Sequence, residues 1–246
     1  MLRESFAALS AVAFLSGCVM PAPQPGGSGS GQFPGSPYGS SAQGFSQDQA
    51  TRRFVAVVDR VEPVAETACR QLAPRASCNF TIYVDPDRTQ PANAAQTLDK
   101  NGNPVVIFNI NLLMEARNED ELAFVLGHEV AHHIRGHINR AQNQAMTGAL
   151  LGSVAAVLIG ADQAGIEQAG QYGAAIGARR FSKDHELEAD ALGARIAWRA
   201  GYDPERGAEF FFRTPDPGNQ FLGSHPPNAD RVATVQREVA RIRAGN

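Results

Sequence analysis

The stretch that decides the fold is residues 118–134, which read NEDELAFVLGHEVAHHI. Asn118 is a favoured N-cap residue, Glu121 stands three positions later, and acidic residues fill the first turn. Apolar residues then recur at helical spacing and supply a buried face: Leu122, Val125, Leu126 and Val130. The sequence therefore predicts a well-capped helix that begins directly after Asn118.

The middle of this predicted helix carries the pentapeptide His128-Glu129-Val130-Ala131-His132. Four residues advance a helix by about 400°, so the two imidazoles share one face and can reach a single cation. Glu129 lies about 100° away from His128, where its carboxylate can take a proton from a metal-bound water. Zinc suits such a ligand set because it binds neutral imidazoles and leaves a position open for water. The alternative is an ordinary polar helix face without a metal.

A third ligand is expected from residues 186–190, which read ELEAD. Glu186 and Asp190 are four residues apart and share a helix face. One carboxylate can therefore bind the metal while the other accepts a hydrogen bond from a ligand imidazole. Glu188 lies about 200° away and is predicted to point elsewhere. The alternative is a solvated acidic start of a helix.

Two other histidines near the pentapeptide are not expected to be ligands. His133 is turned about 100° from His132, and His137 is nine residues past His128. On a continuing helix, nine residues correspond to about 900°, which places His137 on the opposite face. We interpret both side chains as structural or solvent-exposed.

The other predicted elements follow from periodicity and turn signals, and they are helices over 54–72, 182–199 and 228–243 and strands over 80–84 and 104–109. Pro63 is expected to bend or split the first of these helices. Because Pro104 suits a sheet edge, we expect 105–108 to be an edge strand, either purely structural or pairing with an extended substrate. The predicted class is α+β, mostly helical, with a small edge sheet.

Residues 146–160 form an uncharged run rich in Ala, Gly, Leu and Val, and a Gly- and Ala-rich stretch follows to Ala178. The run is too short to span a bilayer. We interpret it either as a mobile helical hairpin over the cleft, in contact with lipid or with segments of membrane proteins, or as a buried core helix.

The length of 246 residues and the net charge of −3 favour one domain with appendages and argue against general nucleic-acid binding. Residues 1–17 resemble an export signal, and Leu15-Ser16-Gly17-Cys18 is similar to a bacterial lipobox that would make Cys18 a lipidated residue. The alternative is an ordinary signal peptide with a chance cysteine. Of residues 19–46, 18 of 28 are Pro, Gly or Ser, which predicts a tether. We therefore expect a signal peptide (1–17), a lipidated tether (18–47) and a folded domain (48–246).

Two cysteines remain if Cys18 carries lipid. In an oxidising compartment, Cys69 and Cys78 are expected to form a disulfide. The competing hypothesis is a pair of zinc thiolates, which the sequence disfavours because no second Cys or His pair lies nearby at finger spacing.

The combined motifs resemble a known family. With HExxH at 128–132, ExxxD at 186–190, Arg180-Phe181-Ser182 and Ser224-His225-Pro226, residues 54–243 are similar to the zinc metallopeptidase family of HtpX, BepA, LoiP and the CAAX prenyl endopeptidase. The resemblance implies a zincin-type domain that binds Zn²⁺. It implies His128, His132 and Glu186 as metal ligands, Glu129 as catalytic base and Asp190 as a second carboxylate behind the ligands.

Two further residues receive roles from the resemblance. His225 would lie over the zinc, where it either stabilises the oxyanion as a catalytic residue or occupies the open coordination position and keeps the enzyme latent. Arg231 either reaches the same oxyanion or is an ordinary surface arginine.

The resemblance is greatest to LoiP-like periplasmic lipoproteins, since transmembrane helices and a tetratricopeptide tail are not found in the sequence. It implies a membrane-tethered zinc endopeptidase that cleaves misfolded or unassembled outer-membrane and periplasmic proteins. The alternative is a periplasmic chaperone or assembly factor with rare peptidase activity. Expected partners are unfolded envelope proteins, the membrane through lipid on Cys18, and outer-membrane assembly machinery, with no nucleic acid. Val19 after Cys18 favours a location in the bacterial periplasm at the outer membrane.

Overall fold

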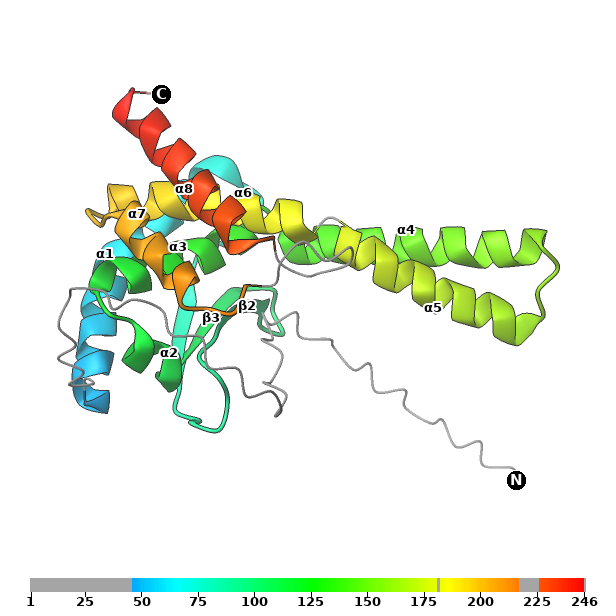
Figure 1. The fold of residues 1–246 in the computed structure, drawn as a ribbon, viewed down its shortest axis with the longest axis horizontal. Coiled ribbons are helices and arrows are strands. Elements are labelled where there is room, and N and C mark those ends of the chain that lie inside the picture. The colour runs from blue at the N-terminus through cyan, green and yellow to red at the C-terminus, as the bar shows by residue number, and fades with distance from the viewer. Residues whose placement is uncertain (1–45, 181, 217–225, 246) are drawn as a thin grey trace, which may run out of the picture.

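A computed structural model describes residues 46–180, 182–216 and 226–245. Figure 1 shows a mostly helical body with one small sheet and a long helical hairpin, so the predicted α+β class is confirmed. The elements in chain order are α1 (Gln47–Leu72), β1 (Thr81–Asp85), β2 (Ala94–Leu98), β3 (Pro104–Asn109), α2 (Ile110–Glu115), α3 (Glu119–Ile134), α4 (His137–Leu158), α5 (Gln163–Arg180), α6 (Ser182–Arg199), α7 (Pro204–Gly207), η1 (Ala208–Phe212) and α8 (Asn228–Arg243).

Helix α3 lies at the centre of the body, between α6 and the sheet (Figure 1). Its start follows the prediction, because the side chain of Asn118 accepts a hydrogen bond of 2.9 Å from the Glu121 amide. Apolar side chains on several faces of the helix are fully buried: Leu122, Ala123, Phe124, Leu126 and Ala131. A helix buried on all sides is held by packing rather than by one amphipathic stripe. Its position in the core fixes where the two pentapeptide histidines lie.

The carboxylate of Glu121 differs from the expected capping arrangement. It does not close the cap onto Asn118 but accepts hydrogen bonds of 2.7 and 2.6 Å from both terminal nitrogens of Arg213. It also accepts one of 2.8 Å from the Arg117 amide. The side chain is almost fully buried, so this pairing compensates the cost of removing its charge from water.

Helices α3 and α6 cross in backbone contact at Gly127 and Gly193. A Cβ atom on Gly127 would lie 2.7 Å from the carbonyl oxygen of Gly193, and one on Gly193 would lie 2.7 Å from the His128 amide nitrogen. No Cβ fits at those distances, so the crossing needs glycine on both helices. The contact brings the carboxylates of α6 next to the histidines of α3.

Helix α1 begins earlier than predicted and is not split at Pro63. Its first turn is closed by a capping box between Ser46 and Gln49. The helix continues through Pro63, so of the two expectations for that residue, a bend or a split, the split is wrong. Pro63 removes a hydrogen bond to the Asp59 carbonyl, but both residues are on the solvent-exposed side, where water can satisfy that oxygen. On the opposite side, Phe54 packs on Phe108 with ring centroids 4.5 Å apart.

The sheet has three strands in the order β1-β3-β2, with β1 parallel and β2 antiparallel to β3. The prediction of an edge strand over 105–108 is therefore wrong, because β3 is the central strand. Strand β2 escaped prediction because its sequence AAQTL is poor in β-branched and aromatic residues. Pro104 is the first residue of β3, a position that tolerates its missing amide proton even in a central strand.

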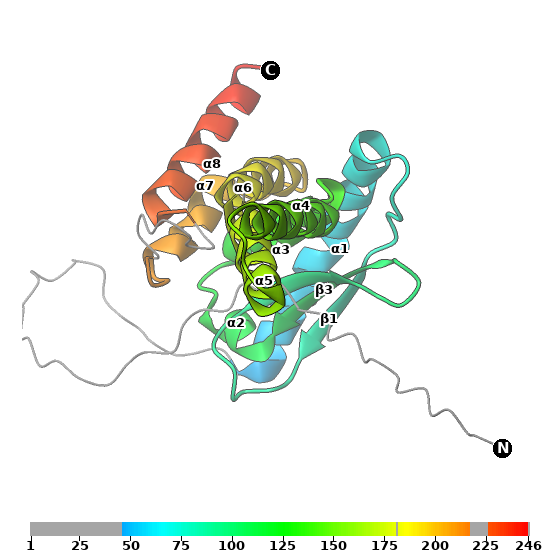
Figure 2. The same ribbon diagram turned by 90° about the vertical axis from the view of Figure 1, so that its right-hand side faces the viewer.

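Helices α4 and α5 form a hairpin that projects away from the body (Figures 1 and 2). Small residues hold the two helices together: a Cβ on Gly148 would lie 2.0 Å from the Gly173 carbonyl oxygen, and one on Gly177 would lie 2.2 Å from that of Gln144. The predicted hairpin is present, but it projects away from the body instead of covering a cleft, and its exposed apolar side chains show that it is not a buried core helix. Within the described residues, no helix is both long enough and apolar enough to cross a membrane.

The outer side of this hairpin is apolar. The large apolar side chains exposed on it are Met146, Leu150, Leu151, Val154, Val157, Leu158, Ile159, Tyr172 and Ile176. Exposure is greatest at the tip, where Leu158 and Ile159 are 81% and 84% exposed. We call this set the hairpin apolar surface.

Two further contacts hold the body together, one made by α8 and one by a disulfide. Helix α8 packs on α6 and η1 through a second apolar cluster that contains Phe211, Val235 and Val239. A disulfide joins Cys69 in the last turn of α1 to Cys78, with their Cα atoms 5.7 Å apart, so zinc thiolates at these positions are excluded.

The glycine crossing predicts a substitution that separates α3, which carries His128 and His132, from α6, which carries Glu186. In Gly193→Ala, the new methyl group would overlap the backbone of α3, so we expect a loss of about 1–3 kcal/mol in the free energy of unfolding. We also expect metal content below that of the wild type. Urea denaturation and elemental analysis measure the two effects. Gly165→Ala on α5 is the matched control and should lower neither quantity, because its Cβ meets side-chain atoms alone and alanine favours a helix more than glycine does. Wild-type stability in Gly193→Ala would contradict the backbone contact.

Candidate metal centre

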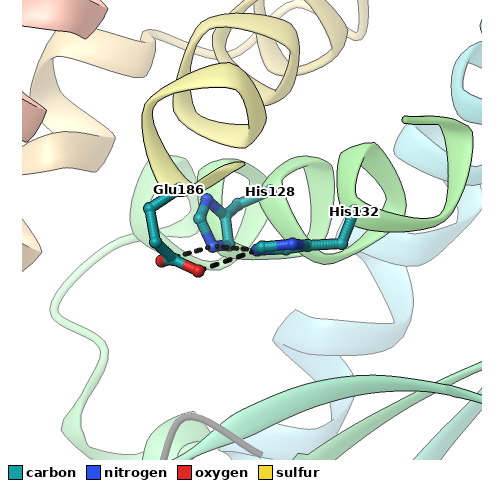
Figure 3. Close-up of side chains that lie close together, drawn as sticks. All are labelled: His128, His132 and Glu186. Atoms are coloured by element: carbon teal, nitrogen blue, oxygen red, sulfur yellow. Dashed lines mark hydrogen bonds and ion pairs between the residues drawn. The ribbon is translucent and has the colours of Figure 1, made fainter. Parts of the chain in front are cut away.

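Three side chains converge where α3 and α6 cross, and Figure 3 shows His128 and His132 of α3 facing Glu186 of α6. The Nε2 atoms of the two histidines are 3.0 Å apart. The Glu186 carboxylate oxygens lie 3.5 Å from His128 Nε2 and 3.3 Å from His132 Nε2. All three potential ligand atoms therefore lie within 4.8 Å of one another. The structure brings together the two separate motifs that the sequence analysis selected.

Asp190 lies behind His128 rather than among the three converging side chains. Its Oδ1 is 2.9 Å from His128 Nδ1, on the side of the ring away from His132. Arg231 donates to both carboxylate oxygens of Asp190, at 2.8 Å from Nε and 2.7 Å from the terminal nitrogen. Burial raises the pKa of Asp190, but the charges and hydrogen bonds of Arg231 and His128 outweigh it and lower that pKa. The carboxylate is therefore ionised and orients the His128 ring.

The electrostatics of the centre favour a positive charge at His128. Burial lowers the pKa of its imidazole. The hydrogen bonds to Asp190 and Glu186 raise that pKa by more than burial lowers it, to about 10. The same carboxylates would stabilise a divalent cation in place of that proton, since cation binding competes with protonation of its ligands.

Arg231 is not a surface arginine. Its side chain is 11% exposed, and its guanidinium lies 3.8 Å above the Phe211 ring centroid. One terminal nitrogen is 3.5 Å from Glu186 Oε2, so the arginine also borders the three converging side chains. The sequence could not show this burial, because it depends on the packing of α8 against η1.

His137 lies beside His132, which contradicts its predicted position on the opposite face. The prediction assumed one continuous helix, but α3 ends at Ile134 and α4 begins at His137. Gly136 between them has a φ of 64°, a left-handed conformation that turns the chain. His137 Nδ1 consequently lies 2.8 Å from His132 Nδ1. Gly136, a common residue at helix ends, was the signal in the sequence that marked the break.

Glu188 points away from the three converging side chains, as predicted, but it has partners that the sequence analysis missed. Its Oε2 is 3.1 Å from His137 Nε2 and 2.6 Å from a terminal nitrogen of Arg140. Burial raises the pKa of Glu188, and the hydrogen bonds from Arg140 and His137 lower it more, to about 2. Burial and the neighbouring His132 lower the pKa of His137 to about 3. At neutral pH the carboxylate is therefore charged and the imidazole is neutral.

Of the other predicted residues, the structure describes Glu129 and His133 but not Cys18 and His225. Glu129 directly follows His128 on α3, and its side chain is 5% exposed. His133 is structural, as predicted, because its Nε2 lies 2.7 Å from the Ser77 carbonyl oxygen and its ring meets Phe80 edge-on. Cys18 and His225 lie outside the described residues.

The fold and this donor set define a metallopeptidase of the HExxH class. The model of Peptidase family M48 matches residues 53–239, and the chain belongs to that family. It is therefore a metallopeptidase, and its resemblance to the zinc-dependent family is confirmed. A comparison with curated proteins finds no match.

The burial of Asp190 predicts the effect of removing Arg231. In Arg231→Ala, a fully buried carboxylate loses its bidentate partner, and we expect the free energy of unfolding to fall by about 3–5 kcal/mol. Denaturation in a chelating buffer isolates this effect from metal binding. Arg237→Ala on the same helix is the control, because that residue is exposed, and it should cost under about 0.5 kcal/mol. Equal stabilities for the two variants would contradict the proposed pairing.

Proposed function

We propose that the protein is a zinc-dependent endopeptidase in which His128, His132 and Glu186 hold the metal. The observation that carries the proposal is the convergence of two imidazoles and one carboxylate from two helices. Two imidazoles and one carboxylate form a known ligand set for catalytic zinc, which keeps a fourth position for water or substrate.

The spacing of the donor atoms fits zinc. A tetrahedral ion with zinc-to-ligand distances of about 2.0–2.1 Å requires its ligand atoms to lie roughly 3.4 Å from one another. The three distances between donor atoms are 3.0, 3.3 and 3.5 Å. A larger oxygen-seeking ion such as Ca²⁺ would instead need six or more oxygen ligands.

Residues of this chain then divide the work of peptide hydrolysis. Zinc, when bound, polarises the peptide carbonyl and lowers the pKa of a water molecule. Glu129 accepts a proton from the attacking water and transfers it to the leaving amine nitrogen. Asp190 and Arg231 keep the His128 ring oriented throughout.

The substrate segment would pair with β2 rather than with β3. Strand β2 is an outer strand of the sheet and contacts α3, which carries Glu129. An extended peptide can add to a free strand edge through main-chain hydrogen bonds, which tolerate many sequences. This mode of binding supports a substrate class of unfolded polypeptides.

We place this activity in quality control of the bacterial envelope. The lipobox-like Leu15-Ser16-Gly17-Cys18 and the Pro/Gly/Ser-rich tether support a lipid-anchored protein, and the Cys69–Cys78 disulfide supports an oxidising compartment. The substrates are then misfolded or unassembled outer-membrane and periplasmic proteins. Outer-membrane assembly machinery is the partner that would present them, and the outer membrane is the proposed location.

The role of Glu129 is tested by its amide isostere. In Glu129→Gln, we expect a full complement of zinc but a loss of at least about 100-fold in cleavage of unfolded casein, because the amide cannot accept the proton. Elemental analysis and release of labelled peptides measure the two properties, and chelation should abolish wild-type cleavage. Full turnover by Glu129→Gln would overturn the assignment.

The hairpin apolar surface favours a second, non-enzymatic function. Large apolar side chains rarely stand together in water unless they bind something, and this surface could hold apolar segments of unfolded proteins. A chaperone or assembly factor on the same fold would use it without peptide cleavage.

Light scattering of an aggregating, chemically denatured protein tests this function. We expect Glu129→Gln to slow the aggregation, and we expect Glu129→Gln combined with Leu150→Asn and Leu158→Asn to lose that protection. The control combination carries Val55→Asn, which is also a large apolar residue exposed to solvent but lies on α1. Equal protection by both combinations would exclude the hairpin as the binding surface.

A further inference from the structure

The two ligand histidines of α3 are supported in different ways. His128 contacts the carboxylate of Asp190 directly through Nδ1, and Arg231 holds that carboxylate. Among the described residues, no such carboxylate contacts Nδ1 of His132. Its Nδ1 lies instead 2.8 Å from Nδ1 of another imidazole, that of His137.

From His137 the contacts continue to a second carboxylate and a second arginine. His137 Nε2 is 3.1 Å from Glu188 Oε2, and Arg140 donates to that same oxygen at 2.6 Å. The two arrangements therefore end alike, in a carboxylate held by an arginine. The difference is one imidazole inserted between ligand and carboxylate on the His132 side.

The hydrogen bonds that connect His132, His137 and Glu188 can all be satisfied by one placement of the ring protons. A metal at His132 Nε2 needs a lone pair there, so the ring proton of His132 is on Nδ1 and is donated to His137. His137 accepts through its own Nδ1, which leaves its proton on Nε2, directed at the Glu188 carboxylate. Glu188 accepts from both His137 and Arg140. Each donor in this series of hydrogen bonds thus meets an acceptor.

The position of His137 is fixed by packing as well as by hydrogen bonds. The side chain is 5% exposed, and its ring stacks on that of His185 with centroids 4.4 Å apart and planes 9° apart. The left-handed Gly136 places His137 at the start of α4, one turn before Arg140 on the same helix. These contacts therefore connect α3, the base of the hairpin and α6.

We propose that His137, Glu188 and Arg140 form a positioning relay that fixes the tautomer and the ring orientation of the metal ligand His132. The relay rests on the proposed zinc site. It makes His137 a positioning residue, since it acts through His132 and not on the substrate. Partners of this kind contribute about 10–100-fold to metal affinity in other metal sites.

The affinity of the full chain for Zn²⁺, measured by competition with a chromophoric chelator, tests the relay. We expect His137→Phe to bind Zn²⁺ about 10–100-fold more weakly than the wild type, because a phenyl ring cannot accept the proton of His132. His137→Gln should recover most of that affinity, since its amide can accept from His132 and donate to Glu188. A substitution that damaged packing alone would not be rescued by glutamine in this way.

The matched control is His133→Phe. His133 directly follows His132 on α3 and is half-buried, but it contacts the Ser77 carbonyl oxygen instead of the relay. Its substitution should leave Zn²⁺ affinity unchanged within about twofold. The visible absorption of the Co²⁺-loaded protein gives a second readout, and it should shift in His137→Phe and not in His133→Phe.

A second variant keeps the proposal testable if His137→Phe does not fold. The Glu188 side chain is 41% exposed, so Glu188→Ala leaves the core intact, and we expect it to weaken Zn²⁺ binding by several-fold. Wild-type affinity in both His137→Phe and Glu188→Ala would overturn the relay while leaving the zinc site in place. A wild-type chain that binds no Zn²⁺ would instead overturn the proposed function itself.

Discussion

The contact between Gly127 and Gly193 is the constraint on which the metal centre depends. It lets the backbones of α3 and α6 touch beside His128, at a distance that any side chain would prevent. Asp190 and Glu186 precede Gly193 by three and seven residues, so all three lie on one face of α6. The face that meets α3 through glycine is therefore the same face that carries the two carboxylates. A separation of the helices by one methyl group would draw both carboxylates away from His128.

Behind each of the two imidazole sites, a carboxylate is followed by an arginine of opposite charge. The Asp190 and Glu188 carboxylates lie behind the imidazoles, and each is held by an arginine, Arg231 or Arg140. The fully buried Asp190 carboxylate would be expensive without a partner, and the bidentate guanidinium of Arg231 compensates much of that cost. Asp190 and Glu188 are thus held behind the histidines, and Glu186 is the carboxylate that faces them. The pattern explains why α8 and the first turn of α4 matter to a site that neither of them enters as a ligand.

The hairpin is built on a different principle from the body. Its helices pack through small residues and backbone, with glycines at the contacts and few large side chains between them. The large apolar residues consequently point outward, where they contribute little to the folding of the domain. The hairpin can thus carry a binding surface while its base, at His137 and Arg140, remains part of the relay.

Local sequence determined much of this protein. The start of α3 at Glu119, the bounds of α8 over 228–243, the pairing of HExxH with ExxxD, and the shared face of Glu186 and Asp190 on α6 all followed from caps, spacing and helical periodicity, which are short-range properties. The tertiary structure alone decided what depends on contacts between distant segments. Strand β2 exists because β3 pairs with it, and its own composition is too weak to specify a strand. Arg231 is buried because α8 docks on η1, and His137 meets His132 because one left-handed glycine ends a helix that periodicity alone would continue. Spacing along a helix fixes which residues share a face. Which other segments contact that face is decided only when the whole chain folds.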